Sequence, residues 1–323
     1  MEETNISKIR VELVDRRERL RQAISRHEAL VQYITLLKEV DSALERIDNH
    51  TYGICDVCHN EIEEGRLMVD PLISVCLDHL DEAQKRFLEE DLDLANKIQR
   101  TMLPSKNLEL DGWDFYYHYE PAGAVSGDYC DIIKDSGSTY FLLGDVSGKG
   151  IAASMLMSHI HALFHSMIPL KLNVDRLVAQ INRLMCESSP SSHYTTLLCI
   201  KAESDGKIEI CNAGHLPLLV AKDNSLLKFD STGMPLGLFC SADYTVSYSA
   251  LEKGDYFVLY SDGLTEATSN EEEYGVERLA KIISENNGLT SKELTEIILI
   301  DVYEFLGGKP KRDDLTIMVI KKL

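Results

Sequence analysis

Residues 141–150 read Phe-Leu-Leu-Gly-Asp-Val-Ser-Gly-Lys-Gly, an apolar run that ends in a glycine-rich turn around Asp145. Three further aspartates lie in glycine- or serine-rich turns or next to short apolar runs: Asp128, Asp262 and Asp313. Such runs predict strands, and glycine lets the backbone approach an ion closely. Each aspartate alone is equally well explained as a turn or cap residue. Together they predict a site for Mg²⁺ or Mn²⁺, which prefer oxygen ligands, and hence a metal-dependent phosphoryl hydrolase.

Length, charge and cysteine content limit the kinds of protein that this chain can be. The chain has 323 residues with 44% apolar content, enough for one large domain plus a small one, or for two domains. Its net charge of −20 argues against a nucleic-acid partner. Residues 1–20 are charged throughout, and we see no signal peptide and no apolar run that approaches membrane-spanning length. Most of the eight cysteines lie scattered in apolar runs. We therefore expect a cytoplasmic protein without disulfides and without a membrane partner.

The N-terminal segment predicts a long helix. Residues 7–48 contain no Gly or Pro, and an apolar stripe follows alternating spacings of four and three. A single helix cannot bury such a stripe, so it must pair with a helix of its own chain or of a second copy. The alternative is a helix packed on a globular core. A second helix is predicted from residue 80 to about 102, where Leu103-Pro104 ends it. We expect a homodimer through residues 7–48 and 80–103.

The rest of the chain predicts an α+β fold. Strands outnumber helices and short turns join many of them, which favours antiparallel sheets flanked by helices. The expected strands are 113–120, 129–133, 140–145, 195–200, 207–212, 216–221, 244–249, 256–261 and 315–321. The expected helices are 151–167, 173–186, 275–285 and 291–306.

Two short pairs of metal-binding residues lie between the two N-terminal helices. Cys55-x-x-Cys58 is followed, after 17 residues, by Cys76-x-x-His79. Two such pairs supply four tetrahedral ligands for one structural Zn²⁺ ion. His59 is a weaker alternative ligand, and three incidental cysteines are the alternative explanation.

The sequence around these cysteines resembles the zinc finger of the DksA/TraR family. The resemblance covers about residues 40–79 and includes Ala-Leu-Glu-Arg-Ile at 43–47 and Thr-Tyr-Gly at 51–53. The departure is His79, where the commonest pattern has a fourth cysteine. In that family a helical hairpin precedes the finger and binds RNA polymerase through its tip. Because residues 7–48 show no turn signal, we do not carry RNA polymerase binding over to this chain.

Residues 94–323 resemble the bacterial SpoIIE/RsbU type of metal-dependent protein Ser/Thr phosphatases, within the type 2C superfamily. The matching segments appear in the family's order, and one departure is Ser126 where a second glycine is usual. The resemblance implies an α-β-β-α sandwich, and we expect domains at 1–80 (helices and finger), 81–105 (linker helix) and 106–323 (phosphatase). The segments are 95–104, 127–131, 144–150, 194–196, 212–217, 235–237, 260–267 and 313–316.

The resemblance also implies the roles of the site residues. Asp145 would bridge two Mn²⁺ or Mg²⁺ ions, and Asp128 with the backbone carbonyl of Val146 would complete the first ion's site. Asp262 and Asp313 would hold the second ion. A water activated by the two ions would attack phosphoserine or phosphothreonine. Asp314, next to Asp313, would shape the turn.

Some roles stay open at this point. Lys149 would either attract substrate phosphate or lie solvated at the start of a helix. His215 is more consistent with a structural hydrogen bond than with a general acid, and no side chain is a clear general acid. The substrate implied by the resemblance is a phosphorylated STAS-type anti-sigma-factor antagonist. The alternative function is a non-catalytic, dimeric partner-binding module that uses the phosphatase fold.

Overall fold

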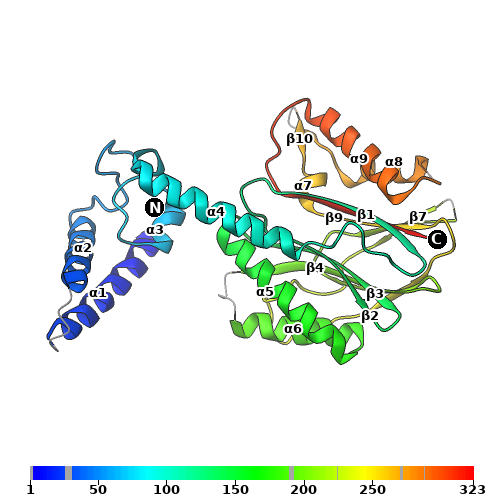
Figure 1. Ribbon diagram of the computed structural model, residues 1–323, viewed down its shortest axis with the longest axis horizontal. Helices are drawn as coiled ribbons and strands as arrows, with labels where there is room; N and C mark the ends of the chain where they lie inside the picture. Colours follow the sequence, from blue (N-terminus) through cyan, green and yellow to red (C-terminus); the bar gives the residue numbers. More distant parts are fainter. Residues whose placement is uncertain (1–2, 26–30, 189–192, 224, 270–271, 287) are drawn as a thin grey trace. The chain divides into compact units, whose positions relative to one another are not determined.

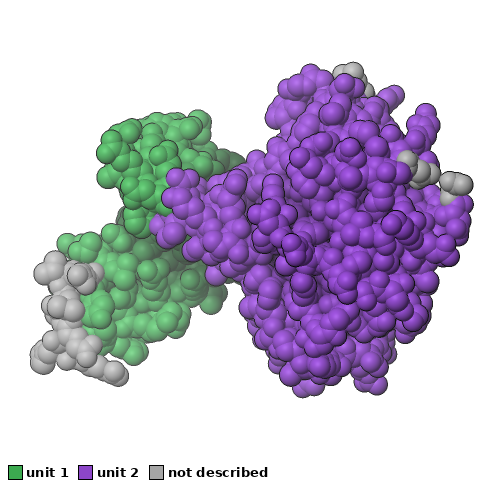
Figure 2. Space-filling view, turned by 45° about the vertical axis from the view of Figure 1, so that its right-hand side comes forward, with its two compact units in different colours: residues 1–90 green, residues 91–323 purple. Residues whose placement is uncertain are grey.

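The computed structural model describes residues 3–25, 31–188, 193–223, 225–269, 272–286 and 288–323. The chain folds into two compact units, residues 1–90 and 91–323 (Figure 2). The boundary falls inside the helix α4, Glu82–Met102. The second unit therefore begins earlier than residue 106, where the sequence analysis starts the phosphatase domain. The reason is that the last turns of α4 bind the loop before β2, as described below.

The first unit contains a helical hairpin, not the single helix that the sequence predicts over residues 7–48. Helix α1 spans Glu3–Ser25 and helix α2 spans Val31–Asp48. An ion pair joins Arg10 Nη2 to Asp48 Oδ1 at 2.8 Å. In one straight helix these two residues would lie about 57 Å apart, at 1.5 Å per residue. The prediction of a continuous helix is therefore wrong, and residues 26–30 lie outside the described residues.

The apolar stripe of the hairpin is buried within its own chain. Leu13 and Val40 are fully buried in one cluster with Ala43 and Leu44, and the cluster continues into the zinc-finger segment. The sequence analysis required a partner helix from the same chain or from a second copy, and α1 and α2 supply it to each other.

The second unit is a four-layer sandwich in which two antiparallel sheets pack face to face between helices (Figure 1). The first sheet has the order β1-β12-β9-β6-β7 and the second the order β2-β3-β4-β5-β8. Helices α5 (Ile151–Met167) and α6 (Val174–Ser188) cover the second sheet, whereas α8 (Val276–Glu285) and α9 (Ser291–Leu306) cover the first. This architecture confirms the predicted α-β-β-α fold.

The strands follow the sequence prediction closely. Every pairing between the strands of the two sheets is antiparallel in the described part of the chain. The strands of the two sheets are β1 Trp113–Glu120, β2 Asp128–Asp135, β3 Ser138–Val146, β4 Thr195–Glu203, β5 Lys207–Ala213, β6 Leu218–Lys222, β7 Ser225–Phe229, β8 Ser247–Ala250, β9 Tyr256–Tyr260 and β12 Leu315–Lys322. A separate short pair is formed by β10 Thr268–Ser269 and β11 Glu272–Glu273. The pattern did not predict β7, whose side chains are mostly exposed.

Aromatic side chains fill the space between the two sheets. The Phe257 ring lies edge-on to Trp113 and to Phe141, with centroids 5.5 and 5.3 Å apart. Along β2 and β3 the residues alternate, so that Cys130 and Leu143 face this inter-sheet core while Tyr129 and Leu142 face α5 and α6. This alternation decides which side chains reach the candidate site.

One helix has the length and composition of a membrane span, contrary to the sequence-based expectation. The segment Ile151–Leu170 has a mean hydropathy of 1.3. In this structure its apolar residues Met157, Ile160 and Phe164 are buried against the second sheet. Such packing accounts for the composition, because the core helix of a globular domain is apolar on the face it buries.

Truncation of a buried hairpin residue tests the corrected fold of the first unit. We expect Leu13→Ala to lower the free energy of opening of α1 and α2 by about 2–4 kcal/mol, because it leaves a cavity in a fully buried cluster. Hydrogen exchange at the amides of both helices in the full chain measures this. Val11→Ala is the control, since Val11 is 69% exposed on the same helix and should change that free energy by less than about 0.5 kcal/mol. Equal losses from both substitutions would contradict the hairpin.

Candidate active site

The second sheet supplies the first pair of aspartates. Asp128 begins β2 and Asp145 lies near the end of β3, and the two residues are direct partners in the ladder. Side chains directly opposite each other on antiparallel strands lie on the same face, with Cβ atoms about 5 Å apart. Like charges in this arrangement destabilise a sheet unless a cation offsets them. The carbonyl oxygen of Val146 lies close to Gly127, beside this pair.

The first sheet supplies the second pair. Asp262 follows β9 and begins the short helix α7, Asp262–Thr265. Asp313 precedes β12, the antiparallel neighbour of β9, so the two residues meet at the same edge of the sheet. Gly263 makes this approach possible, because a Cβ there would lie 2.1 Å from the carbonyl oxygen of Asp314.

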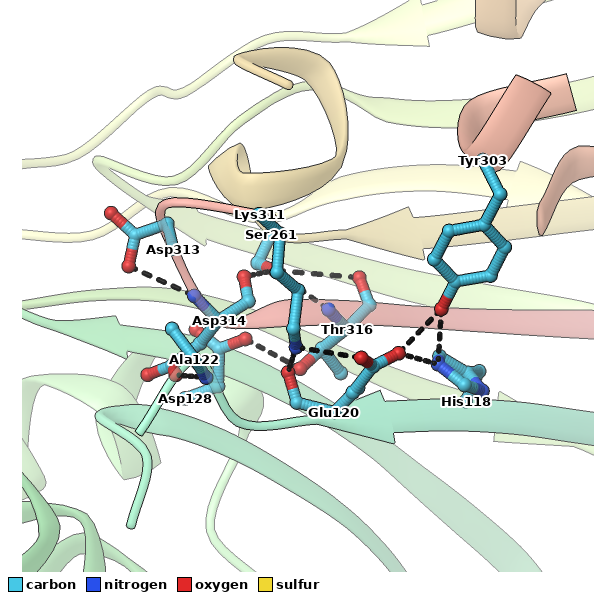
Figure 3. Close-up of polar contacts among 10 residues, drawn as sticks. All are labelled: His118, Glu120, Ala122, Asp128, Ser261, Tyr303, Lys311, Asp313, Asp314 and Thr316. Carbon is cyan, nitrogen blue, oxygen red and sulfur yellow. Dashed lines mark hydrogen bonds and ion pairs between the residues drawn. The ribbon is translucent and has the colours of Figure 1, made fainter. Parts of the chain in front are cut away.

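A hydrogen bond links the two sheets at this edge. Thr316 donates its hydroxyl proton to Oδ2 of Asp128, which is almost completely buried. Ser261 fixes Thr316 in turn, since its Oγ accepts from the Thr316 amide at 2.9 Å and its amide donates to the Thr316 carbonyl. Figure 3 shows these residues converging from β2, β9 and β12. Sequence reasoning missed Thr316, although the residue lies inside the motif at 313–316.

Asp314 anchors the loop in front of β2. One carboxylate oxygen accepts a hydrogen bond from the amide of Ala122 at 2.6 Å (Figure 3). The other accepts from the amide of Gly127 at 2.8 Å. Lys311 holds the start of the same loop. Its ammonium group donates to the carbonyl oxygen of Glu120, the last residue of β1, and lies 3.3 Å from the Glu120 carboxylate. These contacts agree with the expected role of Asp314 in shaping the turn.

Helix α4 holds the same loop from the other side. Gln99 is buried, donates to the carbonyl of Ser126 at 2.7 Å and accepts from its amide at 3.0 Å. This pair of bonds places the loop that leads into Asp128. Sequence reasoning did not assign a role to Gln99, although it lies in the segment 95–104 that carries the family resemblance.

Burial and neighbouring carboxylates raise the pKa values of Asp128, Asp145 and Asp262. Burial and the neighbouring Asp145 raise the pKa of Asp128 well above its ordinary value. Burial, with the charges of Asp262 and Asp313, raises the pKa of Asp145 to about 7. Burial and Asp313 also raise the pKa of Asp262. The site thus concentrates negative charge that a bound cation would stabilise.

This donor set fits divalent cations of the Mg²⁺ and Mn²⁺ type. All of its candidate ligand atoms are oxygens, which these ions prefer. In the described part of the chain, no three of the four aspartates have carboxylate oxygens all within 4.8 Å of one another. Mg²⁺ needs only one or two carboxylates and completes its coordination with water, so pairs of these aspartates suffice as protein ligands.

Lys149 lies at the open edge of the site. Its ammonium group donates to Oδ2 of Asp313 at 2.7 Å and to the carbonyl of Arg312 at 3.0 Å. The hydrogen bond to Asp313 raises the pKa of Lys149, so this side chain stays charged at neutral pH. Its side chain is 63% exposed, so the charge remains accessible to a ligand.

His215 is a structural residue in this fold. Its Nε2 donates to the carbonyl of Tyr260 at 3.1 Å, and its Nδ1 accepts from the Thr196 hydroxyl at 2.8 Å. Burial lowers the pKa of His215 to about 4, so the ring is neutral at pH 7. The ring links β4 to β9 and has no free nitrogen to serve as an acid, as the sequence analysis expects.

The predicted zinc residues converge in the first unit. The ligand atoms of Cys55, Cys58, Cys76 and His79 all lie within 4.8 Å of one another. Although burial opposes it, backbone amides that include those of Cys58 and Cys76 lower the pKa of Cys55 to about 6, which favours a thiolate. Three sulfurs and one imidazole fit a tetrahedral Zn²⁺ ion. Arg46 joins α2 to this segment by donating to the carbonyls of Leu72 and Ile73.

Two sequence families match the chain. The model of the family described as Stage II sporulation protein E (SpoIIE) matches residues 135–322, more than half of the chain. The chain belongs to the SpoIIE family. A second model, the prokaryotic dksA/traR C4-type zinc finger, matches residues 50–78. This match ends one residue before His79, which stands in this chain as the fourth member of the cluster.

The chain is also similar to individual proteins of known sequence or structure. The chain is 28% identical over 238 residues to the phosphoserine phosphatase RsbU of Bacillus subtilis, covering 73% of this chain and 71% of RsbU. It is 24% identical to Protein IcfG of Synechocystis, covering 71% of this chain but only 41% of IcfG. The SiaA-PP2C domain of Pseudomonas aeruginosa superposes with a TM-score of 0.67 at 19% identity, covering 75% of this chain and 99% of that domain. This chain is thus a member of the SpoIIE family that is similar to a phosphoserine phosphatase and shares the fold of a PP2C domain.

The buried state of His215 predicts a pH dependence of stability. Its folded pKa of about 4 lies below the ordinary value of 6.5, so between these values the unfolded chain binds a proton that the folded chain does not. The free energy of unfolding should therefore fall by up to about 3 kcal/mol between pH 7 and pH 4 on account of this residue. His215→Gln should remove that part of the slope.

Fluorescence of Trp113, the single tryptophan, reports unfolding of the second unit for this measurement. His159→Gln, on the outer part of α5, is the control and should keep the wild-type slope. Equal slopes for the wild type and His215→Gln would contradict the assignment of His215 as a buried neutral residue.

Proposed function

We propose that this chain hydrolyses phosphoserine or phosphothreonine on a regulatory protein, a phosphorylated STAS-type anti-sigma-factor antagonist, with two Mn²⁺ or Mg²⁺ ions. The observation that carries this proposal is the meeting of two aspartate pairs, one from each sheet, at a single edge of the sandwich. The likeness to RsbU, a phosphoserine phosphatase, supports the same substrate chemistry.

The chain's own residues divide the work at this edge. Asp145 would contact both ions, with Asp128 and the Val146 carbonyl at the first and Asp262 and Asp313 at the second. When bound, the ions would supply an activated water and neutralise the phosphate oxygens. Thr316 holds the Asp128 carboxylate in place, and Asp314 holds the loop that precedes Asp128. No side chain of the described site is placed as a general acid, so water serves best as the proton source for the leaving hydroxyl.

A phosphate carried by a protein needs an open approach. The side chains of Asp313 and Lys149 are 36% and 63% exposed, which places this side of the site within reach of a phosphorylated loop. The ammonium group of Lys149 would attract the phosphate dianion while the ions hold Asp313. The acidic chain, with its net charge of −20, makes such a local positive group more important.

Neutralising Asp145 tests the catalytic assignment. We expect Asp145→Asn to lower kcat/KM for a phosphoserine protein by on the order of 10²–10³, since it removes the carboxylate shared by both ions. The assay uses the full chain with Mn²⁺ or Mg²⁺. Asp205→Asn, in the exposed turn between β4 and β5, is the matched control and should keep the wild-type rate. An unchanged rate for Asp145→Asn would refute the role of this residue.

The substrate class is tested by comparing two phosphate esters. A phosphorylated STAS-type protein should be hydrolysed with a higher kcat/KM than p-nitrophenyl phosphate, because only the protein can use contacts outside the site. A preference for the small ester would overturn the proposed protein substrate. Absence of Mn²⁺ binding in a calorimetric titration would favour the alternative, a non-catalytic binding module.

We also propose a homodimer, now through α4. The apolar stripes of α1 and α2 are buried against each other, so they are not free to contact a second copy. By contrast, Phe87, Leu94 and Ile98 on one face of α4 are 67%, 56% and 48% exposed. Their spacing of seven and four residues is that of a helix pairing with a second copy of itself. Because α4 also carries Gln99, such pairing would act on the loop before Asp128. A cytoplasmic location fits these partners.

Sedimentation of the full chain tests the dimer. We expect a dimer at micromolar concentration that Leu94→Glu converts to a monomer, because a charge in the paired stripe would be buried without a partner. Val11→Glu, at an exposed position of α1, is the control and should remain dimeric. A wild-type monomer would refute the proposal.

A further inference from the structure

A second group of metal-binding residues lies on the opposite face of β2. Asp128 faces the inter-sheet core, whereas Asp131, three residues further on, faces α5. There it meets His161 and His165, which lie four residues apart on one side of that helix. The mechanism described above uses none of these three residues.

The three side chains converge on one point. Oδ2 of Asp131 lies 3.1 Å from Nδ1 of His161 and 2.8 Å from Nε2 of His165. The ligand atoms of all three residues lie within 4.8 Å of one another, and the two imidazole centroids are 4.2 Å apart. The Asp131 side chain is only 4% exposed.

Hydrogen bonds within the protein account for only part of this arrangement, because Nε2 of His165 is hydrogen-bonded to Oδ2 of Asp131 at 2.8 Å whereas His161 Nδ1 makes no such bond. Oδ2 of Asp131 already accepts from the Tyr129 hydroxyl at 3.1 Å, and Oδ1 accepts from the amide of Ile132 at 2.8 Å. Nδ1 of His161 is buried and has no hydrogen-bond partner among the described residues, despite its position near Oδ2. Buried polar atoms without a partner are rare in native structures, and a bound ion or water is one of the explanations for them.

We propose that Asp131, His161 and His165 bind a divalent transition-metal ion, with Zn²⁺ as the physiological class of ligand. Two imidazoles and one carboxylate are the ligand set of zinc sites that keep an open position. Histidines at positions i and i+4 of a helix present both rings to one ion. The hard aspartate site has no nitrogen or sulfur ligand, so the two sites should select different ions.

Only small adjustments are needed for an ion to enter. Zinc bonds of about 2.0–2.2 Å in a tetrahedron place neighbouring ligand atoms about 3.3 Å apart. The present separations of 2.8 and 3.1 Å therefore need to open by a few tenths of an ångström. The side chain of His165 is 46% exposed, which leaves a path from solvent and room for water at the fourth position.

A bound ion would tie α5 to β2. Helix α5 begins directly after the loop that follows Asp145, and β2 begins with Asp128. The ion would therefore join the two elements that leave the candidate active site. Ligation at this point would stabilise the second unit against unfolding, by the usual linkage between binding and folding.

The test uses the full-length protein with its zinc finger filled and with excess Mg²⁺. Zn²⁺ is titrated by calorimetry, and Co²⁺ serves as a spectroscopic probe. The wild type should bind one more equivalent of Zn²⁺ than His161→Gln/His165→Gln. Co²⁺ should add visible bands without thiolate charge transfer. At a hundredfold excess over the Kd, Zn²⁺ should raise the wild-type Tm, followed by Trp113 fluorescence, by about 5 °C or more.

The controls separate this site from other metal effects. His159→Gln, on the same helix but outside the cluster, should keep the extra equivalent and the Tm shift. The single variant His165→Gln, at a partly exposed position, replaces the double variant if the latter does not fold. Equal zinc binding by the wild type and the folded variant would overturn the proposal. The three side chains would then be held together by hydrogen bonds and ion pairs alone. None of these readouts depends on phosphatase turnover, so the proposed function can fail independently.

Discussion

Mutual repulsion among the four aspartates at one edge of the sandwich, of which Asp128 is almost completely buried, is the constraint around which the second unit is built. Asp128 and Asp145 are held opposite each other by the ladder between β2 and β3, and two more aspartates come from the facing sheet. A fold tolerates such crowding only if its backbone is fixed by other interactions. Here the inter-sheet aromatic core and the hydrogen bond from Thr316 to Asp128 supply that rigidity.

The two ends of the chain illustrate different solutions to holding metal-binding residues together. In the first unit, a compact helical hairpin and short loops hold three cysteines and a histidine, where there is little room for a large core. In the second unit, residues from distant parts of the sequence meet because two large sheets pack together. The zinc residues therefore depend on local spacing, whereas the aspartates depend on the whole sandwich.

The sequence predicts much of this, and the failures have physical causes. The sequence located β1 because its run of aromatic side chains is typical of a strand, and α9 because it is a long run without Gly or Pro that starts at a capping box at Thr290. The hairpin was missed because no Gly or Pro interrupts the four-three stripe through residues 26–30. The aspartates were found because their turns are distinctive. Gln99 and Asp131 were not found, because their roles depend on tertiary packing. Gln99 contacts Ser126, and Asp131 contacts His161 and His165.

The alternation of side chains along β2 has an evolutionary consequence. Asp128 and Asp131 lie an odd number of positions apart, so the strand presents one to each of its faces. Inserting or deleting a single residue between them would move one of the two to the wrong face. Substitutions at exposed helix positions leave this arrangement intact, but length changes within this short stretch should be nearly forbidden. If both faces of β2 bind ions, a length change in this one strand would affect both metal sites at once.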